Sequence, residues 1–478
     1  MLVRSLLLSI LPGLMKPQHG RSIWTSQPES LPQRRVVITG MGIVSPLGVG
    51  LQHNTARLWR GESGIDTIHC GDLLKDCVDD LSFLPADSQY RGLVGGRVPF
   101  GEEPGSLNIS RYMTEESRSK MGRKDMFSYV AGIEALEDAN WAPTSTEQSE
   151  RSGIIISSAL NNSAEVEEMT AILRRNKADI AALPKYSLAV AAVPAIHLGL
   201  EKNLNGPSFG QGAACAGGGY GIATGALLIH SGLADVMVVG GADSAVSLTC
   251  ISSFVRIGAY VPHNDERFIP QKRLRPFDRQ RNGTACGEGA AVLVLEEYEH
   301  AVNRKARIYA EVIGSALHRD GRSITAPNGE GETLTCSRAL KQAGLRPNEI
   351  DLVIPHATGT VVGDPIEALA LNRLFGSYSP MLTATKGATG HQIAAATAFD
   401  TIIAAYSLFH QSVPPIVNLE DPIPESNLFS LVRSAQDAEI DTALVHGLGL
   451  GGEDCAIVLK RMSSPTEHNK AFHPWMFR

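Results

Sequence analysis

Short runs of apolar residues alternate along most of the chain with longer segments in which apolar positions recur at helical spacing. Such runs are typical of strands that are buried on both faces. Strands that alternate with helices form parallel or mixed sheets covered by helices, so we expect an α/β fold. The predicted strands are 36–39, 153–157, 236–240, 290–295, 308–314, 352–355, 442–445 and 455–460.

The alternating pattern spans residues 34–462 and leaves out both ends of the chain. Residues 1–33 are basic and apolar with several serines, and the first acidic residue is Glu29, which is typical of a mitochondrial transit peptide. Their apolar run is about ten residues long, which is too short to span a bilayer. A secretory signal is the competing interpretation, although no Ala-x-Ala-like cleavage site follows, and a plastid address stays open. Residues 463–478 form a polar tail, and no other segment predicts a membrane span.

The composition suits a globular chain that works in a reducing compartment. The 478 residues are 43% hydrophobic and 19% charged, enough for one large or two medium units with a buried core. A formal net charge of −7 argues against a nucleic-acid partner. The cysteines are odd in number and have no disulfide-like spacing, which favours reduced thiols. They are Cys70, Cys77, Cys215, Cys250, Cys286, Cys336 and Cys455.

Cys215 is the first candidate for chemistry. It lies within the run of small residues 206–220, which leads directly into residues 221–230, and these read as a buried helix. Free backbone N–H groups and the positive end of the helix dipole are expected to favour its thiolate form. The small neighbours leave room for a substrate to reach the sulfur. A small buried cysteine of the core is the alternative interpretation.

Two histidines lie further along in similarly small surroundings. His356 follows the strand-like run 350–354, and His391 lies five residues after Lys386. A cysteine, two histidines and a lysine together favour nucleophilic catalysis. A zinc site would use the same residue types, but no CxxC or HxxxH spacing anchors one, so we expect no metal.

These segments together resemble the β-ketoacyl-acyl-carrier-protein synthases, specifically the elongating type that uses Cys-His-His. The resemblance runs from about residue 34 to about residue 462, with the motifs in family order. It implies a thiolase-like fold, a duplicated α/β half arranged in five αβαβα layers, in a homodimer. The nucleophile would lie in residues 34–300 and both histidines in residues 301–462. Further matching segments are 35–48, 236–243, 275–279 and 287–296.

The resemblance implies a decarboxylative Claisen condensation in type II fatty-acid elongation. Cys215 would take an acyl chain from acyl carrier protein as a thioester, and the enolate of malonyl-carrier protein would attack that thioester after losing carbon dioxide. By similarity, His356 and His391 are neutral imidazoles that stabilise the developing oxyanion, and Lys386 orders the site. No cofactor is bound, because the phosphopantetheine is carried on the acyl carrier protein.

The same resemblance assigns supporting roles to further residues. Three threonines match those that hold the pantetheine arm, and three carboxylates are expected to support the site. The threonines are Thr325, Thr358 and Thr360, and the carboxylates are Asp364, Glu367 and Asp400. Backbone N–H groups of Cys215 and Leu448 would form the oxyanion hole. Val166 would cap the acyl pocket, with an ordinary helix residue as the alternative.

The chain departs from the family pattern at several positions. The usual signature Asn-Ser-Phe-Gly-Phe-Gly-Gly-Thr-Asn reads His-Gly-Leu-Gly-Leu-Gly-Gly-Glu-Asp over residues 446–454. Leu448 would therefore replace the phenylalanine that gates access to the cysteine. Ala213 replaces a threonine, Thr284 a phenylalanine and Asp400 a glutamate. We still expect an active enzyme, because Cys215 and its histidine and lysine partners are intact.

Two alternative functions remain open from the sequence. One is a polyketide-type ketosynthase with an unusual substrate, to which the altered gate would belong. The other is a non-catalytic subunit that sets chain length or scaffolds a complex, although such subunits generally lack the cysteine.

Four cations at the start of the helix-like segment 126–139 predict a docking patch for the carrier protein, with a solvated helix face as the alternative. They are Arg118, Lys120, Arg123 and Lys124.

Overall fold

The computed structural model describes residues 34–69, 92–160, 163–175, 196–320 and 322–462. The predicted leader at 1–33, the tail at 463–478, and Cys70 and Cys77 lie outside the described residues. The chain from Arg34 onward groups into one unit, and the description below concerns that unit.

The first half of the unit forms a sheet in the order β6-β5-β7-β8-β1. β5 pairs in parallel with β6 on one side and with β7 on the other, while β8 runs antiparallel to both β7 and β1. Every position of β1, β5, β7 and β8 is buried, because helices cover both faces. The bounds are β1 (Val36–Ser45), β5 (Ser152–Ser157), β6 (Ser208–Phe209), β7 (Val236–Asp243) and β8 (Gly289–Glu297).

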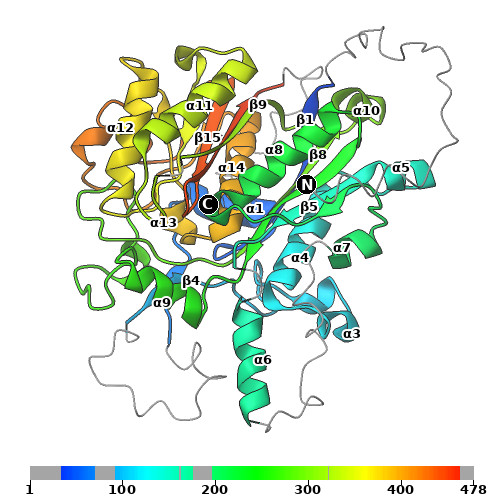
Figure 1. Ribbon diagram of the computed structural model, residues 1–478, viewed down its shortest axis with the longest axis horizontal. Coiled ribbons are helices and arrows are strands. Elements are labelled where there is room, and N and C mark those ends of the chain that lie inside the picture. The colour runs from blue at the N-terminus through cyan, green and yellow to red at the C-terminus, as the bar shows by residue number, and fades with distance from the viewer. Residues whose placement is uncertain (1–33, 70–91, 161–162, 176–195, 321, 463–478) are drawn as a thin grey trace, which may run out of the picture. The chain divides into compact units, whose positions relative to one another are not determined.

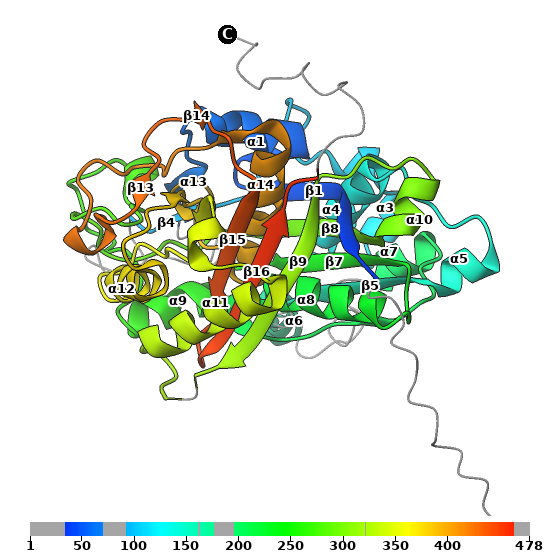
Figure 2. The same cartoon turned by 90° about the horizontal axis from the view of Figure 1, so that it is seen from above.

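The second half repeats this connectivity in the order β11-β10-β15-β16-β9, with β13 added at the outer edge. The two half-sheets meet where β1 pairs with β9, at Val37–Glu311 and Ile38–Ala310 (Figure 2). The fold is therefore an internal duplication in which β9, β10, β11, β15 and β16 correspond to β1, β5, β6, β7 and β8. The bounds are β9 (Ala310–Arg319), β10 (Leu352–Ile354), β11 (Met381–Leu382), β13 (Ser430–Leu431), β15 (Thr442–Leu448) and β16 (Glu453–Lys460).

Helices form the remaining layers of the unit (Figure 1). α8 and α14 share one core cluster with side chains of both half-sheets, so they form the central layer. α4 packs on the outer face of the first half-sheet, and α11 and α12 pack on that of the second. This five-layered αβαβα order confirms the expected thiolase-like α/β fold. The bounds are α4 (Arg123–Asp138), α8 (Gly217–His230), α11 (Gly329–Ala343), α12 (Gly363–Phe375) and α14 (Ala396–His410).

The smaller elements connect these layers. The helices are α1 (Leu51–Trp59), α3 (Glu115–Arg118), α5 (Thr146–Glu150), α6 (Ser163–Arg175), α7 (Ile196–Glu201), α9 (Leu248–Arg256), α10 (Tyr298–Asn303) and α13 (Lys386–Thr389). The strands are β2 (Gly48–Val49), β3 (Ile65–Thr67), β4 (Val94–Gly96), β12 (Ser412–Val413) and β14 (Gln436–Asp437). The 3₁₀ turns are η1 (Ile109–Arg111), η4 (Ala214–Ala216), η5 (Pro270–Lys272), η6 (Pro347–Glu349), η7 (Ile393–Ala395) and η8 (Pro424–Ser426).

The helix after Cys215 begins four residues earlier than the sequence pattern predicts, at Gly217 instead of Gly221. Glycine weakens an isolated helix, which is why the pattern excluded this stretch. Here packing decides, because a Cβ on Gly218 would meet the Ala394 carbonyl oxygen at 2.8 Å. A Cβ on Gly219 would meet the Cys455 sulfur at 2.3 Å. The glycines let α8 approach the second half closely.

One helical stretch, Ile393–His410, is long and apolar enough to cross a membrane by composition. In the structure, 89% of it is buried inside the protein. It contains α14, so its apolar character is accounted for by the central layer. The described residues contain no other stretch of this kind.

Candidate active site

Cys215 lies in η4, the 3₁₀ turn that leads into α8 in the central layer. Its side chain is buried, and the Thr397 hydroxyl of α14 donates to its carbonyl oxygen at 3.1 Å. The residue before it, Ala214, has a φ of 42°, in the left-handed region that non-glycine residues rarely adopt. The turn that presents the sulfur is therefore held by contacts from the second half of the fold.

The other two candidate residues are flanked by the same kind of strain. Ala357, directly after His356, has a φ of 44°. Ile393, two residues after His391, has a φ of 51° and opens η7, which precedes α14 as η4 precedes α8. Such conformations cost about 1–3 kcal/mol each and cluster at sites where geometry is imposed by the surroundings.

The fold brings Cys215, His356 and His391 together, although they come from different halves. The sulfur and one nitrogen of each ring lie within 4.8 Å of one another. The two imidazole centroids are 5.1 Å apart at an interplanar angle of 83°. Phe254 of α9 lies edge-on to the His391 ring with centroids 6.3 Å apart, which limits where that ring can turn.

Both imidazoles are neutral. Burial and then the Lys386 charge hold the pKa of His356 and that of His391 well below the usual range. A neutral ring has one donor and one acceptor nitrogen. Within the described residues the Nδ1 atom of each ring has no hydrogen-bond partner. The pair is thus suited both to donate to an oxyanion and to accept a proton.

The thiol of Cys215 does not follow the expectation of a stabilised thiolate. Burial, followed by the nearby charge of Asp243, raises its pKa to about 12. A hydrogen bond from the Leu450 backbone and the charge of Lys386 act in the other direction but do not compensate. The reason is that the helix start that was expected to stabilise the anion is also where the sulfur is most completely buried. Cys215 must therefore lose its proton during the reaction.

Lys386 is a buried cation at the start of α13. Its Nζ donates to Asp400 Oδ2 at 3.1 Å, and Thr385 Oγ1 donates to the other carboxylate oxygen at 2.5 Å. Burial raises the pKa of Asp400, and Lys386 opposes that rise. The pair fixes the segment between Lys386 and His391 and places a positive charge near both imidazoles.

Two carboxylates at the start of α12 hold the loop that carries His356. Glu367 accepts the backbone N–H of His356 at 2.6 Å and that of Ala357 at 2.7 Å. Asp364 accepts the backbone N–H of Gly359 at 2.9 Å, and burial raises its pKa to about 7. Both residues thus contact the backbone beside the site.

A cavity of about 390 Å³ ends at Cys215, His356 and His391. The three predicted pantetheine residues line it: Thr325, Thr358 and Thr360. The hydroxyls of Thr358 and Thr360 lie 3.1 Å apart, and Thr325 is exposed. Aliphatic side chains at the wall are exposed as well, including Ile324, Val361 and Leu450. The cavity offers hydroxyl groups and an apolar surface to a long, partly polar chain.

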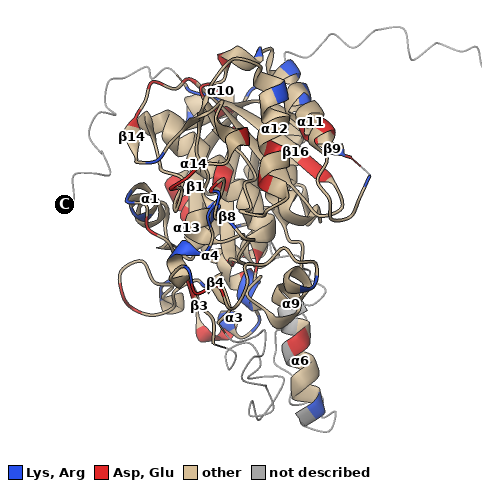
Figure 3. Ribbon diagram, turned by 90° about the vertical axis from the view of Figure 1, so that its left-hand side faces the viewer, with Lys and Arg blue, Asp and Glu red and all other residues tan. Residues whose placement is uncertain are grey.

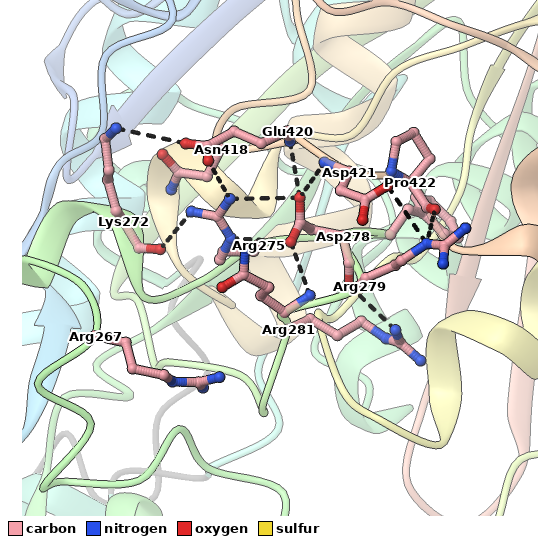
Figure 4. Close-up of polar contacts among 12 residues, drawn as sticks. Arg267, Lys272, Arg275, Asp278, Arg279, Arg281, Asn418, Glu420, Asp421 and Pro422 are labelled. Atoms are coloured by element: carbon pink, nitrogen blue, oxygen red, sulfur yellow. Dashed lines mark hydrogen bonds and ion pairs between the residues drawn. The ribbon is translucent and has the colours of Figure 1, made fainter.

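An ionic network fixes one wall of this cavity (Figure 4). Arg275 is fully buried between Asp278, at 3.2 Å, and Glu420, also at 3.2 Å. Arg281 donates to the carbonyl oxygens of Thr360 at 3.1 Å and Val361 at 2.9 Å. The segment from Arg275 to Thr284 is therefore tied to the loop that carries Thr358 and Thr360. The hydroxyl of Thr284, at a position where the family has phenylalanine, has no hydrogen-bond partner within the described residues.

The backbone N–H nearest the sulfur is not the one that the resemblance assigns to the oxyanion hole. Leu448 lines the cavity, but the backbone N–H that hydrogen-bonds the Cys215 sulfur belongs to Leu450. β15 ends at Leu448, and the turn that follows carries Leu450 towards the cysteine. The signature has two aromatic positions two residues apart, and the sequence alone does not distinguish which of the two backbone amides points at the sulfur.

Val166 does not line the cavity in the single chain. It lies on α6 with 42% of its surface exposed. Nothing in the described chain covers it as the end of an acyl pocket would be covered. The assignment of Val166 to the acyl pocket therefore stays a prediction.

The predicted patch of four cations is not a patch on the surface. Lys124 is buried and donates to Ser158 Oγ at 3.2 Å, and Arg123 pairs with the buried Glu288. The two exposed cations have acidic neighbours, so α3 and the start of α4 carry both signs of charge (Figure 3). The exposed pairs are Arg118–Glu115 at 3.3 Å and Lys120–Glu116 at 2.9 Å.

Sequence reasoning missed residues that act across the two halves. Asp243, at the end of β7, accepts the Ser158 hydroxyl at 2.8 Å and the Ala394 backbone N–H at 2.9 Å. Thr397 and Leu450 contact the Cys215 backbone and sulfur as described above. A carboxylate at the end of a buried strand was the available signal for Asp243, whereas the other two contacts depend on the packing of the halves.

Known proteins match almost the whole described unit. The β-ketoacyl synthase N-terminal domain matches residues 33–301, and the corresponding C-terminal domain matches residues 309–420. The chain is 34% identical over 435 residues to the mitochondrial 3-oxoacyl-[acyl-carrier-protein] synthase of Arabidopsis thaliana, covering 89% of this chain and 93% of that protein. It is 34% identical over 437 residues to 3-oxoacyl-[acyl-carrier-protein] synthase 2 of Rhizobium meliloti, covering 90% and 99%. The crystal structure of a β-ketoacyl synthase from Burkholderia phymatum superposes with a TM-score of 0.78 at 26% identity, covering 90% of this chain and all of the other.

Proposed function

The chain belongs to the β-ketoacyl synthase family, and we propose that it is an acyltransferase that condenses malonyl-carrier protein with an acyl group held on Cys215. The product is a β-ketoacyl-carrier protein, as in type II fatty-acid elongation. The observation that carries this proposal is the meeting of one thiol and two neutral imidazoles at the end of a cavity of about 390 Å³.

In the first half-reaction, the Cys215 sulfur attacks the carbonyl carbon of the acyl-carrier-protein thioester. Because the pKa of this thiol is about 12, its proton must leave as the bond forms, and a neutral ring of His356 or His391 is close enough to accept it. The backbone N–H of Leu450, with that of Cys215, is placed to bind the oxyanion of the tetrahedral intermediate. The carrier thiol leaves with the proton, and the acyl chain stays on Cys215.

In the second half-reaction, the bond between the malonyl α-carbon and its free carboxylate breaks, and carbon dioxide leaves. The electron pair moves into an enolate whose negative charge lies on the thioester oxygen. Hydrogen bonds from the neutral rings of His356 and His391 stabilise that oxygen. The enolate carbon then attacks the acyl carbonyl, the carbon–sulfur bond breaks, and the released Cys215 thiolate takes up a proton from solvent.

The substrates arrive on a phosphopantetheine arm that belongs to the carrier protein, so the enzyme itself needs no cofactor. The walls of the cavity suit such an arm, because Thr325, Thr358 and Thr360 offer hydroxyl groups to its amides. Arg281 holds the loop that carries Thr358 and Thr360 through two backbone carbonyls, which preorganises this wall for the arm.

Further parts of the proposal concern the organisation of the chain. Residues 34–300 form the half with the nucleophile, and residues 301–462 the half with the two histidines. We place the protein in mitochondria as a homodimer, with residues 1–33 as the transit peptide and residues 463–478 as a tail. The basic, apolar leader supports the mitochondrial address, as does the name of the Arabidopsis relative.

The test is intact-protein mass spectrometry of residues 34–478 with acyl-carrier protein, followed by malonyl-carrier protein. We expect one acyl mass on the wild type, its loss when malonyl-carrier protein is added, and a β-ketoacyl product. Cys215→Ala should take up no acyl mass. Absence of acylation at every chain length would move the assignment to a non-catalytic subunit. Acylation only by ketide-like starters would indicate the polyketide type.

A further inference from the structure

His446 occupies a position at which the family signature has asparagine, and the structure gives it an ionic setting. It lies on β15 with 1% of its surface exposed. Its Nδ1 is 2.8 Å from Glu367 Oε1, and its Nε2 is 3.3 Å from Asp454 Oδ1. The Nδ1 contact is a hydrogen bond, whereas the Nε2 contact is an ion pair without hydrogen-bond geometry, because neither Nε2 nor Asp454 Oδ1 has a hydrogen-bond partner within the described residues. A protonated imidazole carries a charge that attracts both carboxylates. An asparagine amide at this position is neutral and would balance the charge of neither carboxylate.

Glu367 links His446 to the reacting centre. The Glu367 oxygen that faces the His446 ring also accepts the backbone N–H of His356 at 2.6 Å, and the second oxygen accepts that of Ala357 at 2.7 Å. Ala357 has the strained φ of 44°. A backbone in this region persists only when its surroundings impose it, and Glu367 supplies two of the hydrogen bonds that do so. Glu367 itself is held by His446.

The charges around His446 come from four directions. Glu367 lies on α12, and Asp454 and Cys455 lie on β16. Glu332 and Cys336 lie on α11, and His356 follows β10. Asp320, which follows β9, acts on Glu332. Burial raises the pKa of Glu332 to about 8, so that carboxyl is protonated at neutral pH. Burial alone would lower the pKa of His446, but Cys336, Asp454 and Glu367 together raise it well above its usual value. The ring is therefore an imidazolium facing two carboxylates.

We propose that His446 is a positioning residue for the decarboxylation step: its charged ring clamps Glu367, and Glu367 fixes His356 where the enolate oxygen develops. The inference rests on the proposed function of the site. It also gives the departure from asparagine a role, because the clamp needs a cation that an amide cannot supply. Cys215 is anchored instead through η4, Thr397 and Leu450, and His391, which Glu367 does not contact, remains to accept its proton. Acyl transfer therefore does not depend on the clamp.

The test compares His446→Asn with a matched control, His300→Asn. His300 makes a similar contact, 2.6 Å to Glu296, but on α10 and outside the cavity lining. For each variant we would measure acyl transfer to Cys215, carbon dioxide release from malonyl-carrier protein, and the midpoint of thermal unfolding. We expect His446→Asn to slow carbon dioxide release by about 10- to 100-fold, the size of effect that misplaced catalytic groups produce. Acyl transfer should change by less than about threefold, and His300→Asn should change neither rate.

The pH dependence of the wild-type enzyme provides a second measurement that needs no variant. Because the pKa of His446 is raised in the folded protein, the ionic clamp is present at lower pH and is lost as the pH rises through that value. Carbon dioxide release should therefore fall on the alkaline side, whereas acyl transfer, which needs the thiol deprotonated, should not. In His446→Asn this alkaline fall should be absent.

Several outcomes would overturn the inference. These are an equal loss of both half-reactions in His446→Asn, a loss no larger than in His300→Asn, or no alkaline fall of carbon dioxide release in the wild type. The last decides the matter if His446→Asn does not fold. A wild type that neither takes up acyl groups nor releases carbon dioxide would overturn the proposed function itself, which is a distinguishable result.

Discussion

At the scale of single residues, the site combines groups that burial drives towards their neutral forms. Cys215 is a thiol with a raised pKa, and His356 and His391 are imidazoles with lowered pKa values. Lys386 is the exception, a buried cation kept in place by Asp400. Among these residues, one charged side chain thus lies beside three neutral acid–base groups.

Replacing Lys386 tests this dependence. In Lys386→Met the Asp400 carboxylate loses its partner, and we expect the free energy of unfolding to fall by about 3–5 kcal/mol, as when one member of a buried pair is removed. Lys386 also lowers the pKa of both histidines, so its loss should move the acidic limb of the carbon dioxide release profile to higher pH. Chemical denaturation and a pH–rate profile would check both effects.

The matched control is Lys202→Met, which removes a partly exposed lysine paired with Glu201. We expect a change within about 0.5 kcal/mol, as for most surface substitutions. Equal stability of the two variants would mean that Asp400 finds another partner or takes up a proton.

Removing metal ions tests the alternative chemistry of the same three residues. Their atoms lie within 4.8 Å of one another and are of types that bind zinc. Zinc binds the thiolate, which burial of Cys215 disfavours. We therefore expect dialysis against a chelator to leave the condensation rate unchanged. A loss of activity that zinc restores would assign the three residues to a metal site.

At the scale of elements, the site is made by two equivalent turns. η4 leads into α8 and η7 leads into α14, each opening with a non-glycine residue at positive φ, Ala214 and Ile393. The helices pack against each other closely because glycines replace side chains at the start of α8. Placement of Cys215 therefore depends on the fit between these two helix starts.

Gly219→Ala tests this fit. The added methyl group would meet the Cys455 sulfur at 2.3 Å and the Thr397 methyl at 2.9 Å. We expect the free energy of unfolding to fall by about 1–3 kcal/mol, as when a packed core is overfilled, and acylation of Cys215 to slow. Leu227→Ala, at a position on the same helix that is 65% exposed, is the control and should change little. Thermal unfolding and acylation kinetics would measure both effects. Equal behaviour of the two variants would contradict the dependence of Cys215 on close packing of the helix starts.

The sequence reveals the strands better than it reveals their duplication. Continuous apolar runs mark strands such as β7 and β8 because both of their faces are buried. The sequence pattern itself shows no repeat, so the duplication is expected from the family resemblance alone and is shown by the sheet order. The reacting residues stand out because Cys215 and His391 lie among small residues. Contacts such as Leu450 with the sulfur, or His446 with Glu367, depend on strand ends and helix starts that meet only in the folded chain.

At the scale of the whole molecule, the described unit ends on one side at the edge strand β6. Within the described sheet, β6 pairs only with β5, which leaves its other edge unpaired. Phe209 on this strand is 37% exposed. An unpaired edge with an exposed aromatic side chain favours association with a second chain, in line with the proposed homodimer.

Phe209→Lys tests that association. We expect the wild type to sediment at twice the chain mass and Phe209→Lys to shift towards the monomer, because a charge at a buried interface is unfavourable. Leu428→Lys changes an exposed leucine near η8 and should leave the mass unchanged. Analytical ultracentrifugation of all three proteins would decide, and a monomeric wild type would contradict the proposed dimer.

The duplication also limits how many acyl groups each chain can hold as thioesters at once. In η7, the position equivalent to Cys215 in η4 is Ala394, whose methyl group cannot form a thioester. The two equivalent turns thus have different roles: η4 carries the nucleophile, and η7 follows directly after the segment with His391. Acyl loading should consequently saturate at one equivalent per polypeptide, however much donor is supplied. A fold with two equivalent halves therefore has one acylation site.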